Sequence, residues 1–260
     1  MNNKIKVSIL IANYNNKNYI NKCIKSLLNQ TYKNIEIIFH DDCSKDESIK
    51  IASKYKSIKI IKNKIRDKNG SYNQLKACER AFKKSNGEII FLMDSDDHFK
   101  KNKISQVVKN FTKNKKLQGI YDLPIFDHGE KKIKINKKDK LIRTYWPYIP
   151  PQSCISIKRK NFSKIMNSIN FKKFPNIWMD FRIAIYLKYI SKNYFILNDN
   201  LTYYRQSSNN VSSNFSFLSS SWWKRRMEAH EYIKFFFLKN KINYKKNYDY
   251  YLTLIVNKFI

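Results

Sequence analysis

The chain has 260 residues, enough for one large domain or two small ones, and 15% of them are aromatic, which can fill a substantial core. Its formal charge of +32 favours anionic partners such as nucleotide phosphates, nucleic acid or an acidic membrane, although a solvated basic surface is an equal alternative. The 4 glycines exclude a phosphate-binding loop and a dinucleotide-binding fingerprint, because no two of them have the required spacing.

Cysteine and histidine usage indicates a reducing compartment. The 4 cysteines lie far apart and the 4 histidines have no zinc-binding spacing. No apolar run approaches the ~18 residues of a membrane-spanning helix, and no N-terminal leader is recognisable. We therefore expect a cytoplasmic protein, with peripheral attachment to the inner face of the membrane left open.

The first part of the chain alternates between strand-like and helix-like patterns. Apolar, β-branched runs predict four strands, at residues 5–12, 35–39, 58–61 and 88–93. Apolar residues at helical spacing predict three helices between them, at residues 19–28, 46–55 and 75–82. This order predicts an α/β fold with a mostly parallel sheet and helices on both faces.

Acidic residues follow two of these strands. The second strand ends at Asp41 and Asp42, and the fourth ends at Asp94-Ser95-Asp96-Asp97. Parallel strands bring their carboxyl ends to one edge of a sheet, which is where such folds bind ligands. Hard cations such as Mg²⁺ and Mn²⁺ take oxygen ligands and are often shared with substrate phosphates. The pattern predicts a cation site, and a solvated turn is the alternative.

The middle of the chain is less regular. Its pattern predicts, in order, a basic helix at 101–116, a strand at 119–126, a Lys-rich hairpin or loop at 130–143, an aromatic and proline-rich turn at 146–151, a strand at 154–157, a helix at 177–190, two closing strands at 194–197 and 201–205, and a loop at 206–214. The proline-rich turn either lines an acceptor pocket or simply packs against the core.

The composition changes again from Phe215. Residues 222–246 contain eight Lys and Arg against two Glu, interleaved with aromatic residues in a helical stretch, and a second helical stretch covers 244–259. Such a mixture suits a helix lying on an anionic membrane. The alternatives are a helical pair that packs on the rest of the protein, or a homo-oligomer contact.

Several motifs follow one another in a fixed order. They are residues 7–15, 26–32, 36–46 and 87–97, followed by the looser motifs Trp178-Met179-Asp180 and Tyr203-Tyr204-Arg205. The ordered series resembles the inverting family 2 glycosyltransferases of the GT-A fold, closely over residues 5–98. The resemblance implies a GT-A type domain at 1–210, with a nucleotide-sugar half at 1–98 and a smaller acceptor-side half at 99–210. Residues 211–260 would form a basic, aromatic, helical extension.

The resemblance also implies roles for individual residues. The nucleotide would contact Ala12, Asn13, Tyr14, Asn15, Asp41, Asp42, Asp94 and Ser95, with either Asp41 or Asp42 bonded to the base. Asp96 would bind the Mn²⁺ or Mg²⁺ that bridges the diphosphate, and Asp180 would be the general base. Further contacts to the phosphates or the acceptor would come from Arg66, Lys76, Arg205 and Trp178.

Four positions depart from the family pattern. Ala12 stands where Pro is usual, Tyr72 where an Arg near the phosphates is frequent, and Ser207 where His is frequent. Cys43 stands where Gly is usual, and a cysteine tolerates a positive φ angle poorly. We therefore expect a slightly altered turn at Cys43, and Lys76, Arg66 or Arg205 as the replacement for the missing phosphate-side arginine.

The resemblance implies metal-dependent, inverting transfer of a hexosyl or N-acetylhexosaminyl group from a UDP-sugar to a glycan or lipid-linked acceptor. Two alternatives stand beside it. A sugar nucleotidyltransferase needs a Gly-rich loop after the first strand, and residues 13–17 contain no Gly. A basic nucleic-acid-binding protein is compatible with the charge, but no recognised nucleic-acid motif is present, so we expect no specific nucleic acid.

Overall fold

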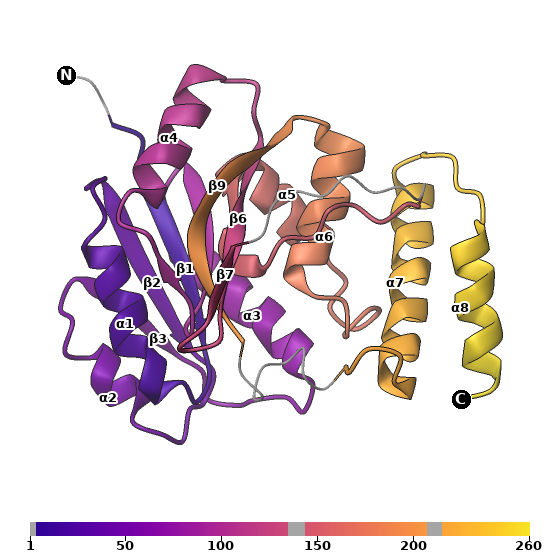
Figure 1. Ribbon diagram of the computed structural model, residues 1–260, viewed down its shortest axis with the longest axis horizontal. Coiled ribbons are helices and arrows are strands. Elements are labelled where there is room, and N and C mark those ends of the chain that lie inside the picture. Colours follow the sequence, from indigo (N-terminus) through magenta and orange to yellow (C-terminus); the bar gives the residue numbers. More distant parts are fainter. Residues whose placement is uncertain (1–3, 135–143, 207–214) are drawn as a thin grey trace.

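The computed structural model describes residues 4–134, 144–206 and 215–260. Within these residues, a twisted nine-stranded sheet forms the centre of the molecule, with helices on both faces (Figure 1). A pair of antiparallel helices, α7 and α8, lies at the edge farthest from the first strands (Figure 1). The predicted α/β architecture is confirmed.

The first four strands are parallel neighbours, as predicted. They are β1 (Val7–Asn13), β2 (Ile35–Asp41), β3 (Ile58–Lys62) and β4 (Ile89–Asp94), in the order β3-β2-β1-β4. In this register Asn13 lies opposite Asp41, and Ala12 lies opposite Asp94. The carboxyl ends that carry the acids therefore meet at one edge of the sheet.

The sheet continues beyond β4 with mixed directions. The order is β4-β8-β6-β9-β5, and β7 (Lys132–Lys134) pairs with β6. The new strands are β8 (Ile155–Lys158), β6 (Gly119–Asp127), β9 (Tyr194–Arg205) and β5 (His98–Phe99). Strand β8 is antiparallel to both of its neighbours, β4 and β6. The two predicted closing strands are one continuous strand, β9. Irregular register against β6 near Leu123 lets β9 run through the polar stretch that separated the two predictions.

Two hydrophobic clusters cover the two faces of the sheet. Successive side chains of a strand point to opposite faces, so Ile9 and Ile11 join one cluster while Leu10 joins the other. The first cluster packs against α1 (Lys17–Leu28) and α4 (Lys103–Lys113). The second packs against α3 (Gly70–Lys83), α5 (Arg159–Ser168) and α6 (Met179–Tyr186).

Helix boundaries differ from the predictions in three places. Helix α2 covers only Ser48–Ala52, because Asp46 bonds the backbone N–H groups of both Lys17 and Ser48 instead of opening a longer helix. Helix α6 ends in a π-helical turn, Leu187–Ser191. A separate one-turn 3₁₀ segment, Gln152–Cys154, precedes β8. Helix α5 has no counterpart among the predictions, since its ten residues include only three buried apolar ones, Phe162, Ile165 and Met166.

The C-terminal helices pack on the rest of the protein. Helix α7 (Ser220–Lys239) buries Ala229, Ile233, Phe236 and Phe237 in the second core cluster. Helix α8 (Tyr248–Lys258) lies beside α7 (Figure 1) and also accepts a hydrogen bond from Trp146 through Asp249. Phe236 and Phe237 therefore belong to the core, and the interpretation of the α7 aromatics as a membrane-facing surface is wrong for both. No described helix is long and apolar enough to cross a bilayer. Residues 207–214 of the predicted loop at 206–214, and most of the Lys-rich segment at 130–143, lie outside the described residues.

Candidate functional site

A cavity of about 470 Å³ opens where β1, β2 and β4 end. Ala12 and Asn13 from β1, and Asp94 from β4, form part of its wall, together with Asp42 just beyond β2. Later segments of the chain also contribute to the lining, with Pro150, Pro151, Gln152, Trp178, Asp180, Tyr204 and Arg225. The cavity thus joins acids and aromatic residues that are far apart in the chain.

The structure separates the two adjacent acids after β2. The Oδ1 atom of Asp41 accepts a hydrogen bond from Asn13 Nδ2 at 2.7 Å, and Oδ2 accepts one from Ser44 N–H at 2.9 Å. Asp41 is fully buried and does not line the cavity, whereas Asp42 does. Asp42 is therefore the acid available to a ligand, and Asp41 holds the turn in place.

Asp42, Arg66 and Tyr14 form a compact group on the cavity wall. Arg66 Nε lies 2.9 Å from Asp42 Oδ2, and its guanidinium carbon lies 3.5 Å above the Tyr14 ring. Asn63 Nδ2 donates to the other oxygen of Asp42 at 2.7 Å. A planar guanidinium stacked on an aromatic ring and oriented by a carboxylate offers flat surface and polar edges together, which are the features that bind a heterocyclic base.

The turn after β2 keeps an unusual backbone despite the cysteine. Cys43 has φ 61°, in the left-handed region where the absence of glycine costs about 1 kcal/mol or more. Asn15 also has a positive φ of 51°, donates its N–H to Ser44 Oγ and accepts from Lys45 N–H. Cys43 therefore takes the left-handed conformation that glycine usually occupies. Asn15 is exposed and ties two loops together, but it does not line the cavity.

Two carboxylates, one at the end of β4 and one just beyond it, face the cavity. Asp94 Oδ1 accepts hydrogen bonds from Gln152 Nε2 at 2.8 Å and from Gln74 Nε2 at 3.1 Å. Burial and the neighbouring Asp96 raise the pKa of Asp94 to about 7, and burial also raises the pKa of Asp96. Ser95, which lies between them in the chain, is uncharged, and its Oγ accepts a hydrogen bond from Asn16 Nδ2 at 2.8 Å. The pair binds protons or a cation more readily than isolated acids would.

These donors fit a divalent cation that is shared with a substrate. The described residues contain no cluster of three or more His, Cys, Asp or Glu arranged to hold a metal by themselves. Mg²⁺ and related cations are commonly held by one or two carboxylates, with phosphate oxygens and water completing the shell. Asp94 and Asp96, both on the cavity wall with raised pKa values, match that division.

Asp180 reaches the cavity from the first turn of α6. Its Oδ1 atom accepts the backbone N–H of Phe181 at 2.7 Å, which fixes the carboxylate. Burial raises the pKa of Asp180 to about 7; the Phe181 bond and Arg225 oppose this rise, and Asp94 adds to it. A carboxylate with a pKa near neutrality can both hold and release a proton under physiological conditions.

Arg225 is one of several cavity residues that the sequence interpretation missed, together with Gln74 and Gln152, which bond Asp94. Arg225 comes from α7, and its guanidinium carbon lies 3.7 Å from the centre of the Trp178 ring and 4.0 Å from that of Phe215. Its Nε donates to Asn176 O at 3.1 Å, and burial lowers its pKa to about 10. Within Trp222-Trp223-Lys224-Arg225-Arg226, nothing in the local pattern separates Arg225 from its basic neighbours.

Of the four predicted phosphate or acceptor contacts, Arg66 and Trp178 line the cavity, and Lys76 and Arg205 do not. Lys76 lies outside the lining, because its amine pairs with Glu79 at 2.9 Å and lies 3.7 Å above the Phe171 ring. Arg205 also lies outside the lining and supports the acidic loop from behind, donating Nε to Asp96 O at 3.2 Å and its backbone N–H to Asp97 Oδ1 at 2.8 Å.

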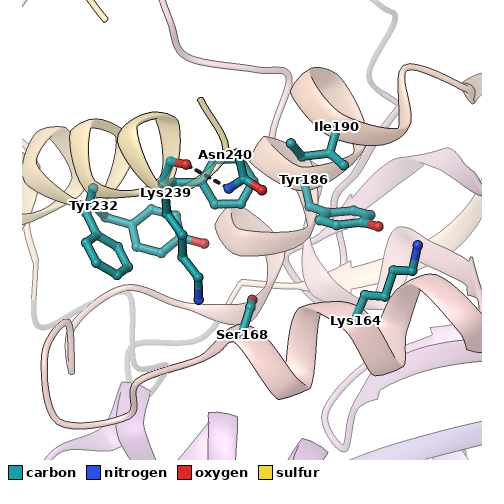
Figure 2. A pocket seen from close by; sticks show the side chains of 9 residues that line it. Lys164, Ser168, Tyr186, Ile190, Tyr232, Lys239 and Asn240 are labelled. Carbon is teal, nitrogen blue, oxygen red and sulfur yellow. Dashed lines mark hydrogen bonds between the residues drawn. The ribbon is translucent and has the colours of Figure 1, made fainter. Parts of the chain in front are cut away.

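A second cavity, of about 280 Å³, lies between α5, α6 and α7 (Figure 2). Tyr186 and Tyr232 flank it, and Lys164 and Lys239 reach toward it from opposite helices in Figure 2. Its lining contains no acid. It offers neither cation ligands nor a proton acceptor of the kind found in the larger cavity, so we place the candidate site in the larger one.

Comparisons with known proteins point to one family. The model described as "Glycosyl transferase family 2" matches residues 8–182. The Escherichia coli protein "UDP-Glc:alpha-D-GlcNAc-diphosphoundecaprenol beta-1,3-glucosyltransferase WfaP" is 42% identical over 105 residues, which cover 39% of this chain and 39% of that protein.

Solved structures share the fold at low sequence identity. S. aureus TarS 1–349 in complex with UDP-GlcNAc aligns with a TM-score of 0.63 and 16% identity, covering 86% of this chain and 65% of that one. The mannosyltransferase PcManGT from Pyrobaculum calidifontis in complex with GDP-Man and Mn²⁺ aligns with a TM-score of 0.59 and 12% identity, covering 99% and 70%. The chain thus spans 39% of the E. coli protein and 65% of the TarS chain.

Proposed function

The chain belongs to glycosyl transferase family 2, and from that premise we propose that it transfers a sugar from a nucleotide diphosphate donor to a hydroxyl group of a glycan or lipid-linked acceptor. One observation carries the proposal. A single cavity receives the acid pair Asp94 and Asp96, the separate carboxylate Asp180, and the stacked Arg66–Tyr14 pair. These groups match the three needs of the reaction, namely a leaving phosphate, an acceptor proton and a nucleoside.

The donor is bound across the β-strand ends. The base lies against Tyr14, Arg66 and Asp42, with Asn13 at the end of β1 beside it. The ribose and diphosphate extend toward Asp94, Ser95 and Asp96. We propose a UDP-sugar, because the TarS structure of this fold holds UDP-GlcNAc and the E. coli relative is named for UDP-Glc. A hexosyl or N-acetylhexosaminyl group is the transferred sugar.

Asp96, assisted by Asp94, would hold Mn²⁺ or Mg²⁺ on the diphosphate side of the cavity. When bound, the cation offsets the negative charge that develops on the leaving phosphate. The PcManGT structure of this fold contains Mn²⁺. In this chain, the shared burial and mutual repulsion of the two acids favour the same occupant, because a cation removes the need for a proton.

Asp180 is the general base. It takes the proton from the acceptor hydroxyl as the oxygen of that hydroxyl bonds to the anomeric carbon of the donor. The bond between this carbon and the phosphate oxygen breaks in the same step, and its electron pair leaves with the nucleotide diphosphate. A single displacement of this kind inverts the anomeric centre, and one positioned carboxylate is sufficient for it.

The acceptor enters beside Trp178 and the proline-rich turn, at the side of the cavity away from the nucleoside. Residues 1–98 serve the donor and residues 99–210 the acceptor, while the extension at 211–260 completes the cavity through Arg225. We place the enzyme at the cytoplasmic face of the membrane, since the E. coli relative is named for a diphosphoundecaprenol-linked acceptor. Arg225 replaces the phosphate-side arginine whose usual position holds Tyr72.

A thermal-shift experiment tests the donor assignment. UDP-GlcNAc and UDP-Glc should each raise the melting temperature in the presence of Mn²⁺, and by less with EDTA, because a ligand that binds only the native state stabilises it. GDP-Man serves as the control for base selection and should have a smaller effect. If none of the three nucleotide sugars raises the melting temperature, the proposed function is contradicted.

The pH dependence of transfer should depend on Arg225. Because Asp180 must be ionised to act as a base, kcat/KM should fall as the pH drops through about 7. The Arg225 charge lowers the pKa of Asp180, so Arg225→Gln should move this limb to higher pH, whereas Arg225→Lys should leave it in place. Carboxyl carbon NMR of Asp180 provides a readout that needs no acceptor. Identical titrations in both variants would contradict the coupling.

A further inference from the structure

Helix α8 turns its polar side chains toward the protein and its apolar side chains outward. Asp249, Thr253 and Asn257 recur every four residues and face α7 and the core. The outward face carries Tyr248, Tyr251, Leu252, Ile255 and Phe259, exposed by 59%, 50%, 52%, 54% and 84%. These positions also fall on one helical stripe. The amphipathic pattern is therefore the reverse of that of a surface helix in water.

Specific bonds keep the polar face inward. Asp249 is buried and bonded to the Arg226 guanidinium and to the indole N–H of Trp146, and it lies 3.3 Å from His230 Nε2. Thr253 Oγ1 accepts from Arg226 Nε at 3.3 Å. Rotating α8 to bury its apolar face would leave these groups unpaired inside the protein, which is costly. The outward direction of the apolar stripe is therefore built into the fold.

Asn257 continues this contact to the end of the helix. Its Nδ2 atom donates to Trp223 O at 3.1 Å, near the start of α7. In Figure 1, α8 is the outermost element, with α7 between it and the rest of the molecule. No other described element covers its outward face, so the exposed stripe is available to an external partner.

The charge around the stripe favours a lipid surface over a second copy. Between residues 240 and 260 the only acid is Asp249, which is buried and paired, while Lys245, Lys246 and Lys258 are exposed. Two copies of a chain with a formal charge of +32 would repel when these basic faces approach. An anionic bilayer attracts the lysines and accepts the apolar side chains in its interfacial layer.

We propose that the outward face of α8 inserts into the interfacial layer of an anionic lipid bilayer and anchors the protein there, with α8 parallel to the membrane plane. The lysines contact lipid phosphates, and Leu252, Ile255 and Phe259 enter the boundary with the acyl chains. The anchor would hold the cavity at the membrane surface, where a lipid-linked acceptor lies. This link to the acceptor, but not the anchor itself, rests on the proposed function.

Flotation with vesicles tests the anchor in the 260-residue chain. Binding should be strong to vesicles of equimolar phosphatidylglycerol and phosphatidylcholine, weaker to pure phosphatidylcholine, and reduced by salt. Ile255→Ser should weaken it roughly fivefold, and Leu252→Ser/Ile255→Ser/Phe259→Ser roughly a hundredfold. Phe195→Ser is the matched control, since Phe195 is 45% exposed on β9 in the sheet, and it should bind as the wild type does.

Three results would overturn the anchor. The first is vesicle binding by the triple variant equal to that of the wild type, and the second is equal binding to neutral and anionic vesicles. The third is a dimer that sediments without lipid and that the triple variant converts to monomer, because a second copy would then cover the outward face of α8. The melting temperature with UDP-GlcNAc and Mn²⁺ is measured on the same samples. A protein that binds vesicles but ignores the nucleotide sugar would contradict the proposed function and leave the anchor standing.

Discussion

Replacing Asp180 with asparagine should lower the rate of sugar transfer by about 10²–10⁴-fold, the usual worth of a positioned general base. Asparagine has nearly the same shape, and its Oδ1 can still accept the Phe181 N–H that holds Asp180 in place. It cannot accept the acceptor proton at neutral pH. We therefore expect UDP-sugar binding, measured by calorimetry with Mn²⁺, to stay near the wild-type value while turnover falls.

Asp199→Asn is the matched control for this experiment, because Asp199 is exposed on β9 and does not line the cavity. It should leave both binding and turnover unchanged. Parallel losses of donor binding and turnover in Asp180→Asn would show that Asp180 holds the donor, and would remove it from the role of base. Full activity in Asp180→Asn would exclude it from the chemistry altogether.

Replacing Asp96 with alanine should lower turnover by about 10²–10³-fold, the scale seen when one group that stabilises developing charge is lost. The same variant should lose the extra thermal stabilisation that Mn²⁺ adds to UDP-sugar binding. The reason lies in the acid pair. With Asp96 gone, Asp94 alone faces the diphosphate, and the repulsion that Asp96 exerts on Asp94 disappears.

The metal dependence of Asp96 can be checked without turnover. Mn²⁺ binding in the presence of UDP should release protons and strengthen as the pH rises through about 7, because the pKa of Asp94 lies there and that of Asp96 is raised. Asp199→Ala should behave as the wild type does. Unaltered Mn²⁺ affinity in Asp96→Ala would place the cation elsewhere.

The donor side of the site was largely predictable from sequence. Its residues lie at the ends of buried strands or directly beyond them, so the strand prediction also locates them: Asn13 at the end of β1, Asp42 after β2, and Asp94 to Asp96 from the end of β4 onward. Parallel pairing then brings these ends to one edge, as the register of Asn13 with Asp41 and of Ala12 with Asp94 shows. Local pattern and short-range connection were sufficient here.

Adjacent residues with the same chemistry were not distinguishable. Asp41 and Asp42 are neighbours in the chain, and only the bonds to Asn13 and Ser44 show that Asp41 is turned inward. Lys76 likewise resembled a phosphate ligand, but a glutamate one helical turn away pairs with it. Which way a polar side chain turns depends on partners that a linear pattern does not show.

The acceptor side and the C-terminal helices depended on tertiary structure. Arg225 lies 45 residues after Asp180, in a segment whose pattern indicated only a basic aromatic helix, and it meets Trp178 only because α7 packs on α6. The direction of the α8 stripe likewise follows from the bonds of Asp249 to Arg226 and Trp146.

Residue order alone established the parallel sheet, the acids at its edge and the family, because each depends on contacts between a strand and its immediate neighbours. The folded molecule decided which acids face the ligand, which arginine completes the cavity and which face of α8 meets the outside. Those outcomes depend on contacts between segments far apart in the chain. Their free energy comes from burying and pairing specific groups together, and no single stretch of sequence contains both partners.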